Sequence, residues 1–184
     1  QKIYIGRSGG NMSITAYCVV DGEMTSVEEI TGNISMSTAN SPYDNFGSSF
    51  ALGTYANGEL LMVSSSSCDS KGGYCEGYET TPFSNVFSLQ SAWIQLFIKP
   101  RGQPNFSIVD IRGASYIYSN NYTGYGATVV SDGGSVFYVA EPVYGNGRVH
   151  VITVTENDIA LIGTIDSPME LHGTPDFKKY SFGL

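Results

Sequence analysis

Apolar and polar residues alternate along much of the chain in short runs, which is the pattern that half-buried β-strands produce. The runs are rich in β-branched and aromatic residues, and Gly, Asn, Asp or Pro residues separate them. No segment keeps the helical period of about 3.6 residues over several turns, and at most one helical turn fits Pro82–Gln90. The sequence therefore predicts an all-β fold. The predicted strands are Lys2–Ile5, Ser13–Val20, Leu60–Ser64, Trp93–Lys99, Ser107–Ile111, Ser115–Tyr118, Ser135–Ala140, Arg148–Val154 and Asp158–Ile165.

A repeated pattern groups these strands into units. An aromatic residue followed by glycine opens a strand at Phe46-Gly47 and at Tyr125-Gly126, and the same pair occurs at Phe182-Gly183. After each of the first two pairs a short turn leads to an apolar return strand, and two further strands follow. A unit therefore has four strands, and the chain holds about three units. The return strands that align with one another are Lys2–Ile5, Leu60–Met62 and Val136–Val139.

This pattern resembles the FG-GAP repeat of the integrin-α-type β-propeller. In that family an FG strand is followed by a strand that ends in VGAP and then by a strand of the type GxVYVF. The aromatic-glycine pairs correspond to FG, Val139-Ala140-Glu141-Pro142 corresponds to VGAP, and Gly147-Arg148-Val149-His150-Val151 corresponds to the third strand. The alternative is an unrelated β-sandwich.

The resemblance implies a single all-β unit of about three blades, at roughly 2–59, 60–135 and 136–184. A propeller closes its ring with roughly four to eight blades, and folded proteins avoid unpaired sheet edges. We therefore expect a protein partner to complete the sheets: another copy of the chain, the remainder of a larger chain, or a neighbour in a filament.

Many FG-GAP repeats bind calcium between their first two strands, and this sequence departs from that pattern. The segment Gly53–Gly58 has no carboxylate before Glu59, and the turn at 131–134 has only Asp132. Calcium takes about six to eight oxygen ligands, several of them from carboxylates. We expect no metal and no cofactor here, and calcium elsewhere in a larger propeller stays open.

Composition narrows the classes of partner. The chain of 184 residues is 41% hydrophobic and only 14% charged, which excludes an intrinsically disordered protein. Its net charge of −8 disfavours nucleic acids and anionic membranes as partners. No apolar run approaches the length of about 20 residues that spans a bilayer, so we expect no membrane span.

Cysteines and glycosylation sequons indicate the compartment. Cys68 and Cys75 flank a segment with two glycines, which allows a disulfide, although two free thiols remain the alternative. Cys18 lies in an apolar run and is either a buried free thiol or bonded outside this chain. Together with a low lysine content, these features predict a secreted or cell-surface protein that carries N-linked glycans. The four candidate acceptors are Asn11, Asn33, Asn105 and Asn121.

Candidate chemistry is sparse, and we predict no catalytic residues. His150 lies at an alternating strand position, where we expect it to face solvent or a neighbour. Glu28 and Glu29 are adjacent on a strand, so they point to opposite faces and make a poor acid/base pair; we expect both to be solvated.

An aromatic and polar cluster is the one candidate binding site, for sugars or a partner surface. It comprises Tyr116, Tyr118, Tyr122 and Tyr125. The sequence thus favours an extracellular glycoprotein that acts in structural assembly, adhesion or protein–protein binding. The alternative is a secreted hydrolase that acts on glycans or lipids on a propeller scaffold.

Overall fold

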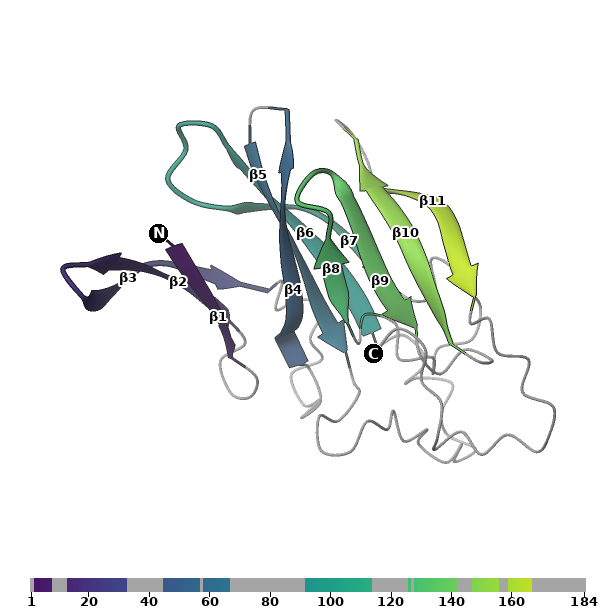
Figure 1. The fold of residues 1–184 in the computed structure, drawn as a ribbon, viewed down its shortest axis with the longest axis horizontal. Coiled ribbons are helices and arrows are strands. Elements are labelled where there is room, and N and C mark those ends of the chain that lie inside the picture. The colour runs from purple at the N-terminus through teal and green to yellow at the C-terminus, as the bar shows by residue number, and fades with distance from the viewer. Residues whose placement is uncertain are drawn as a thin grey trace.

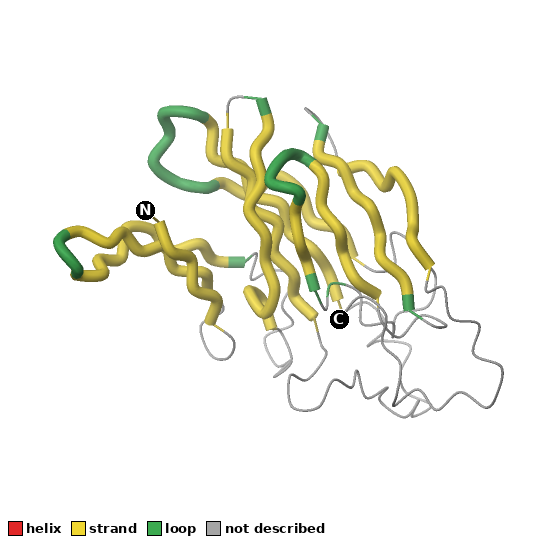
Figure 2. The backbone as a smooth tube through the Cα atoms, in the orientation of Figure 1, coloured by secondary structure: helices red, strands yellow, loops and turns green. Residues whose placement is uncertain are grey.

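A computed structural model describes residues 2–7, 13–32, 45–56, 58–66, 92–113, 126, 128–141, 147–155 and 159–166. Every regular element in these residues is a β-strand, so the predicted all-β fold class is confirmed (Figure 2). The described part of the chain contains no helix with the length and apolar character needed to cross a bilayer.

The strands form three antiparallel sheets (Figure 1). The N-terminal sheet has the order β1-β2-β3, the middle sheet β4-β5-β6-β7 and the C-terminal sheet β11-β10-β9-β8. The strands are β1 (Lys2–Arg7), β2 (Ser13–Val20), β3 (Glu23–Thr31), β4 (Asn45–Tyr55), β5 (Gly58–Ser66), β6 (Ala92–Pro100), β7 (Ser107–Gly113), β8 (Val129–Ser131), β9 (Val136–Glu141), β10 (Arg148–Val154) and β11 (Ile159–Asp166). Within each sheet, strands that follow one another along the chain are hydrogen-bonded neighbours, as is usual for antiparallel sheets.

The rough unit divisions can be placed on these sheets. The division at 59/60 lies near the start of β5 in the middle sheet, and the division at 135/136 lies at the start of β9 in the C-terminal sheet. The aromatic-glycine strand therefore belongs to the same sheet as the return strand that follows it. The predicted strand Ser115–Tyr118, the helical turn at Pro82–Gln90 and the pair Phe182-Gly183 lie outside the described residues.

The three sheets lie in a row with the middle sheet between the other two, and they do not close into a ring (Figure 1). Strand β4 contacts β1 on one side and β8 on the other. An open row is compatible with an incomplete propeller and with a sandwich.

The middle sheet is buried on both faces, which explains the uninterrupted apolar run at residues 60–63 of β5. Leu60 and Met62 face the C-terminal sheet, whereas Leu61 and Val63 face the N-terminal sheet. All four side chains are fully buried. Such a strand loses the polar-apolar alternation of a strand with one wet face.

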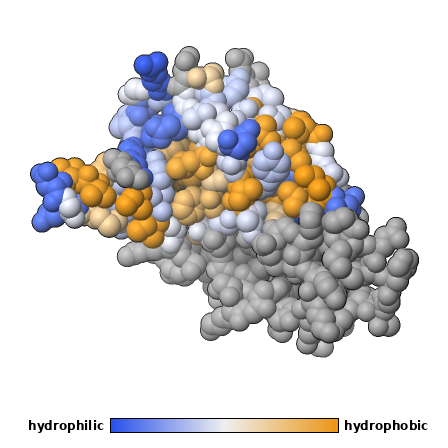
Figure 3. All heavy atoms as spheres, viewed as in Figure 1, coloured by the Kyte–Doolittle hydropathy of each residue, from blue (hydrophilic) through white to orange (hydrophobic). Residues whose placement is uncertain are grey.

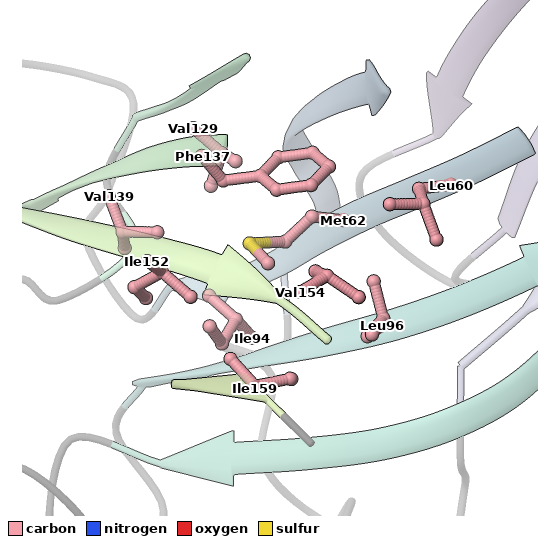
Figure 4. Packing of buried hydrophobic residues seen from close by; sticks show 10 residues of the cluster. All are labelled: Leu60, Met62, Ile94, Leu96, Val129, Phe137, Val139, Ile152, Val154 and Ile159. Carbon is pink, nitrogen blue, oxygen red and sulfur yellow. The ribbon is translucent and has the colours of Figure 1, made fainter. Parts of the chain in front are cut away.

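One core fills the space between the middle and C-terminal sheets (Figure 4). It contains side chains from β5, β6, β8, β9, β10 and β11, and Phe137 lies fully buried among them. Its members are Leu60, Met62, Ile94, Leu96, Val129, Phe137, Val139, Ile152, Val154 and Ile159.

A second, smaller core joins the N-terminal and middle sheets. Ile14 and Ile30 come from the N-terminal sheet and meet Phe46, Leu61 and Phe97 of the middle sheet. The rings of Phe46 and Phe97 pack edge to face, with centroids 6.1 Å apart and an interplanar angle of 70°. This geometry is favourable for two aromatic quadrupoles.

Strand β4 is hydrogen-bonded to the C-terminal sheet. The Thr54 amide donates to the carbonyl of Gly134 at 3.0 Å, and the Thr54 hydroxyl donates to the carbonyl of Gly133 at 2.9 Å. The Val129 amide donates to the Ser49 hydroxyl at 2.8 Å. These polar contacts fix how the two sheets lie against each other, a constraint that apolar contacts impose only loosely.

The two aromatic-glycine pairs whose glycines the structure describes have the same φ angle at that glycine. Gly47 and Gly126 both have φ of +82°, a region that other residues rarely adopt. The repeat seen in the sequence is therefore also a repeat in backbone geometry at these two positions.

Gly53 marks a close approach between β4 and the C-terminal sheet. A Cβ atom there would overlap the carbonyl oxygen of Gly134 and lie 2.8 Å from the Phe137 ring. We predict that Gly53→Ala lowers the free energy of unfolding by about 1–3 kcal/mol through overpacking. Denaturant unfolding measures this loss.

The matched control is Gly163→Ala in β11, because a Cβ atom at Gly163 meets nothing within 4 Å. This variant should stay within about 0.5 kcal/mol of the native chain. Equal stability of the two variants would contradict the packing described here.

Candidate functional site

Few of the site residues predicted from the sequence fall in the described part of the chain. Asn105 lies there, exposed, in the loop between β6 and β7. Cys18 is a free, partly buried thiol on β2. The other predicted site residues lie outside the described residues: Asn11, Asn33, Asn121, Cys68, Cys75, Tyr116, Tyr118, Tyr122 and Tyr125.

A polar cluster lies at the junction of the N-terminal and middle sheets. Lys99 and Glu59 are directly opposite each other on β6 and β5, and the Lys99 Nζ lies 2.5 Å from the Glu59 Oε2. The same ammonium lies 4.7 Å from the centroid of the Phe106 ring, which permits a cation–π interaction. Lys99 is almost fully buried, whereas the carboxylate of Glu59 is half exposed.

The charges of this cluster shift two pKa values. Burial by itself lowers the pKa of Lys99, but the hydrogen bond to Glu59 and the neighbouring groups outweigh burial and raise it. Burial raises the pKa of Tyr4, although the positive charge of Lys99 partly offsets this. A lysine that acts as a base or nucleophile needs a lowered pKa. Lys99 thus serves as a stabilising cation between the sheets.

Glu28 is buried, contrary to the expectation that it is solvated, but it does point to the opposite face from Glu29, as expected. Its carboxylate is buried and accepts a hydrogen bond from the Phe106 amide at 2.5 Å, so it is not solvated as expected. Glu29 is exposed, so the adjacent carboxylates do point to opposite faces of the strand. Glu28 holds the β6–β7 loop of the middle sheet against the N-terminal sheet.

His150 faces a neighbouring side chain, which is one of the two surroundings expected for it. It is fully buried on β10, and its Nε2 lies 2.6 Å from the Glu141 Oε2 on β9. Glu141 comes from the VGAP-like segment and is itself 1% exposed. Because a general acid or base must reach its substrate, this enclosed pair is placed to join strands rather than to catalyse.

The turn that carries Asp132 uses its carboxylate internally. The Gly134 amide donates to the Asp132 Oδ1 at 2.7 Å, which is an Asx-type turn. Within the described ranges, no group of three or more His, Cys, Asp or Glu side chains is arranged to hold a metal ion.

A small hollow of about 240 Å³ opens between the end of β3 and the β6–β7 hairpin. Ile30, Phe97, Phe106 and Ile108 supply apolar walls, and Glu29 supplies a carboxylate. Pockets for drug-sized ligands usually measure about 300–1,000 Å³, so this hollow suits at most a single side chain.

Two sheet faces with exposed apolar side chains lie at the ends of the row of sheets in the described part of the chain. The N-terminal face is the side of the N-terminal sheet that points away from the middle sheet. Ile3 and Ile5 lie on it with 38% and 45% of their surface exposed. The strand register places Ile3, Ile5, Tyr17, Val19 and Met24 on this face, together with the polar residues Thr15, Ser26 and Glu29.

The C-terminal face is the side of the C-terminal sheet that points away from the middle sheet. Val130 is 50% exposed and Ile165 is 48% exposed. The register defines this face by Val130, Tyr138, Val149, Val151 and Ile165.

Apolar side chains gather on the arm formed by the N-terminal sheet and over the C-terminal sheet (Figure 3). Exposed apolar side chains are ordinary when they are scattered, but a contiguous patch marks an interaction site. These faces were not among the sites predicted from the sequence. The apolar residues at successive positions of Lys2–Ile5 and Val136–Val139 do indicate strands with two apolar faces.

In comparisons with known proteins, no protein-family model matches the chain, and no curated protein matches it significantly. The two outer sheet faces are therefore candidate binding sites on the strength of their geometry alone.

The polar cluster makes the free energy of unfolding fall at alkaline pH. The pKa values of Lys99 and Tyr4 are raised in the folded state, so the folded chain holds these protons more tightly than the unfolded chain does. The resulting stabilisation is fully present below the ordinary pKa values, which are 10.0 for Tyr4 and 10.5 for Lys99. It is lost as the pH rises through the raised pKa values of the folded state. We predict a steeper alkaline loss of stability for the native chain than for Glu59→Gln, because the Glu59 carboxylate helps to raise both pKa values.

Urea unfolding at pH values from neutral to about pH 11 measures this slope. Glu29→Gln, which changes an exposed carboxylate, is the control and should leave the native slope intact. An unchanged slope in Glu59→Gln would contradict the assignment.

Proposed function

We propose that this chain is an extracellular glycoprotein whose FG-GAP-like, propeller-type sheets act in assembly and protein–protein binding. The observation that carries the proposal is the contrast between the middle sheet, which is covered on both faces, and the two end sheets. Each end sheet buries one apolar face and leaves another apolar face partly exposed. Apolar sheet faces are buried in stable architectures, so an occupant for each outer face is expected.

The polar groups of the described sheets support a binding role over catalysis. Lys99 with Glu59, Glu28 with the Phe106 amide, and His150 with Glu141 each join two strands or two sheets. Their ionisable groups are thus engaged in holding the sheets together. No observation favours the alternative of a hydrolase that acts on glycans or lipids.

The first test measures the mass of the chain in solution over a wide range of concentrations. We expect the average mass to rise with concentration, or a stable oligomer or fibre to form, because each outer face offers apolar surface. Sedimentation velocity or light scattering measures this directly. A compact monomer at every concentration that hydrolyses glycans or lipids would overturn the proposal.

The second test concerns the glycan. Asn105 is exposed in a loop, as an acceptor asparagine must be, and Ser107 completes its sequon. On secretion from eukaryotic cells, we predict that Asn105→Gln and Ser107→Ala each reduce the intact mass by one N-glycan. Ser107→Thr preserves the sequon and should retain that glycan. An identical mass for the native chain and Ser107→Ala would remove Asn105 from the acceptor sites.

A further inference from the structure

The second strand of the middle sheet presents alternate side chains to opposite neighbours. Leu61 and Val63 point back to the N-terminal sheet, and Leu60 and Met62 point forward to the C-terminal sheet. Each sheet of the repeat thus has a backward face and a forward face, defined by its second strand.

The C-terminal sheet follows the same rule. The sequence repeat aligns Leu61 with Phe137 and Met62 with Tyr138. Phe137 points back and is buried against the middle sheet, as Leu61 is buried against the N-terminal sheet. Tyr138 therefore lies on the forward face of its sheet, at the position where the middle sheet has Met62. The forward face of the middle sheet is covered, whereas that of the C-terminal sheet is the partly exposed C-terminal face.

The N-terminal sheet shows the complementary arrangement. Tyr4 points forward and packs against the core of the middle sheet. Its neighbours Ile3 and Ile5 point backward and lie exposed on the N-terminal face. These two residues occupy the side of the second strand that, in the other two sheets, covers the sheet before it.

We propose that the C-terminal face binds the N-terminal face of a second copy of this chain, head to tail. The proposal rests on the proposed function and names its partner. The new junction would continue the two junctions inside the chain, because it joins a forward face to a backward face with the same orientation in the repeat. Every junction then buries branched apolar side chains against one another.

Head-to-tail contacts are heterologous, so they close a ring when the rotation permits and otherwise form a filament. Two copies would supply about six sheets, which lies within the range of roughly four to eight that closes a propeller. A face-to-face contact between two N-terminal faces would instead join two backward faces, an arrangement that neither internal junction uses.

The experiment blocks one face at a time. Ile5→Glu places a charge on the N-terminal face, and Val130→Glu places one on the C-terminal face. A carboxylate buried at such a contact is costly, so each variant alone should weaken self-association by about a hundredfold. Ile3→Glu and Ile165→Glu are second variants on the same two faces. Val109→Glu is the matched control, because Val109 is exposed on edge strand β7 and belongs to neither face.

Mixing the two blocked variants is the decisive step. Ile5→Glu retains an intact C-terminal face, and Val130→Glu retains an intact N-terminal face, so an equimolar mixture should form a dimer with one native junction. Sedimentation velocity measures this complex, and far-ultraviolet circular dichroism with thermal unfolding verifies that each variant is folded. Heterodimer formation from two monomeric variants supports the head-to-tail contact.

Other outcomes overturn the proposal in distinguishable ways. If Ile5→Glu still dimerises through its C-terminal face, two like faces form the contact. If neither single variant weakens an association that the native chain shows, the contact lies elsewhere; both results reject the head-to-tail arrangement and leave the proposed function standing. If the native chain stays monomeric at every concentration, a second copy is not the occupant. The proposed function itself then fails only if the monomer proves to be a hydrolase.

Discussion

Burial of the middle sheet on both faces is the constraint on which the rest of this structure depends. Strand β5 contributes to two cores at once, because alternate side chains point in opposite directions and both sides are apolar. Removing either neighbouring sheet would expose fully buried leucine, methionine and valine side chains to water. The three sheets therefore stabilise one another as a unit, with the middle sheet as the element that both neighbours need.

Polar contacts fix the position of each sheet against the next, which the apolar cores alone would not define closely. On one side, Thr54 and Ser49 connect β4 to the β8–β9 hairpin and to β8. On the other side, Glu28 accepts the Phe106 amide, and Lys99 with Glu59 forms a charged pair beside Tyr4. Buried polar groups of this kind must be satisfied, so they admit few alternative positions of one sheet against the next.

The same arrangement accounts for the surface of the molecule. A repeat that stacks sheet on sheet needs two apolar faces on every sheet, and the first and last sheets of any open row keep one such face unmatched. The N-terminal and C-terminal faces are these two remaining faces. The binding that we propose would continue folding, since the apolar contacts that hold the sheets together inside the chain are also those that the outer faces offer.

The amino-acid sequence by itself determined the strand content and the positions of the turn glycines, because these follow from local alternation and turn geometry. It misjudged Glu28, because a polar residue at an alternating position is solvated or buried according to what covers that face. Only the tertiary structure decided which face of each sheet was covered, which carboxylate met Lys99, and which apolar residues remained exposed. Those outcomes depend on contacts between strands far apart in the sequence, and the local pattern of residues carries no information on their register or packing.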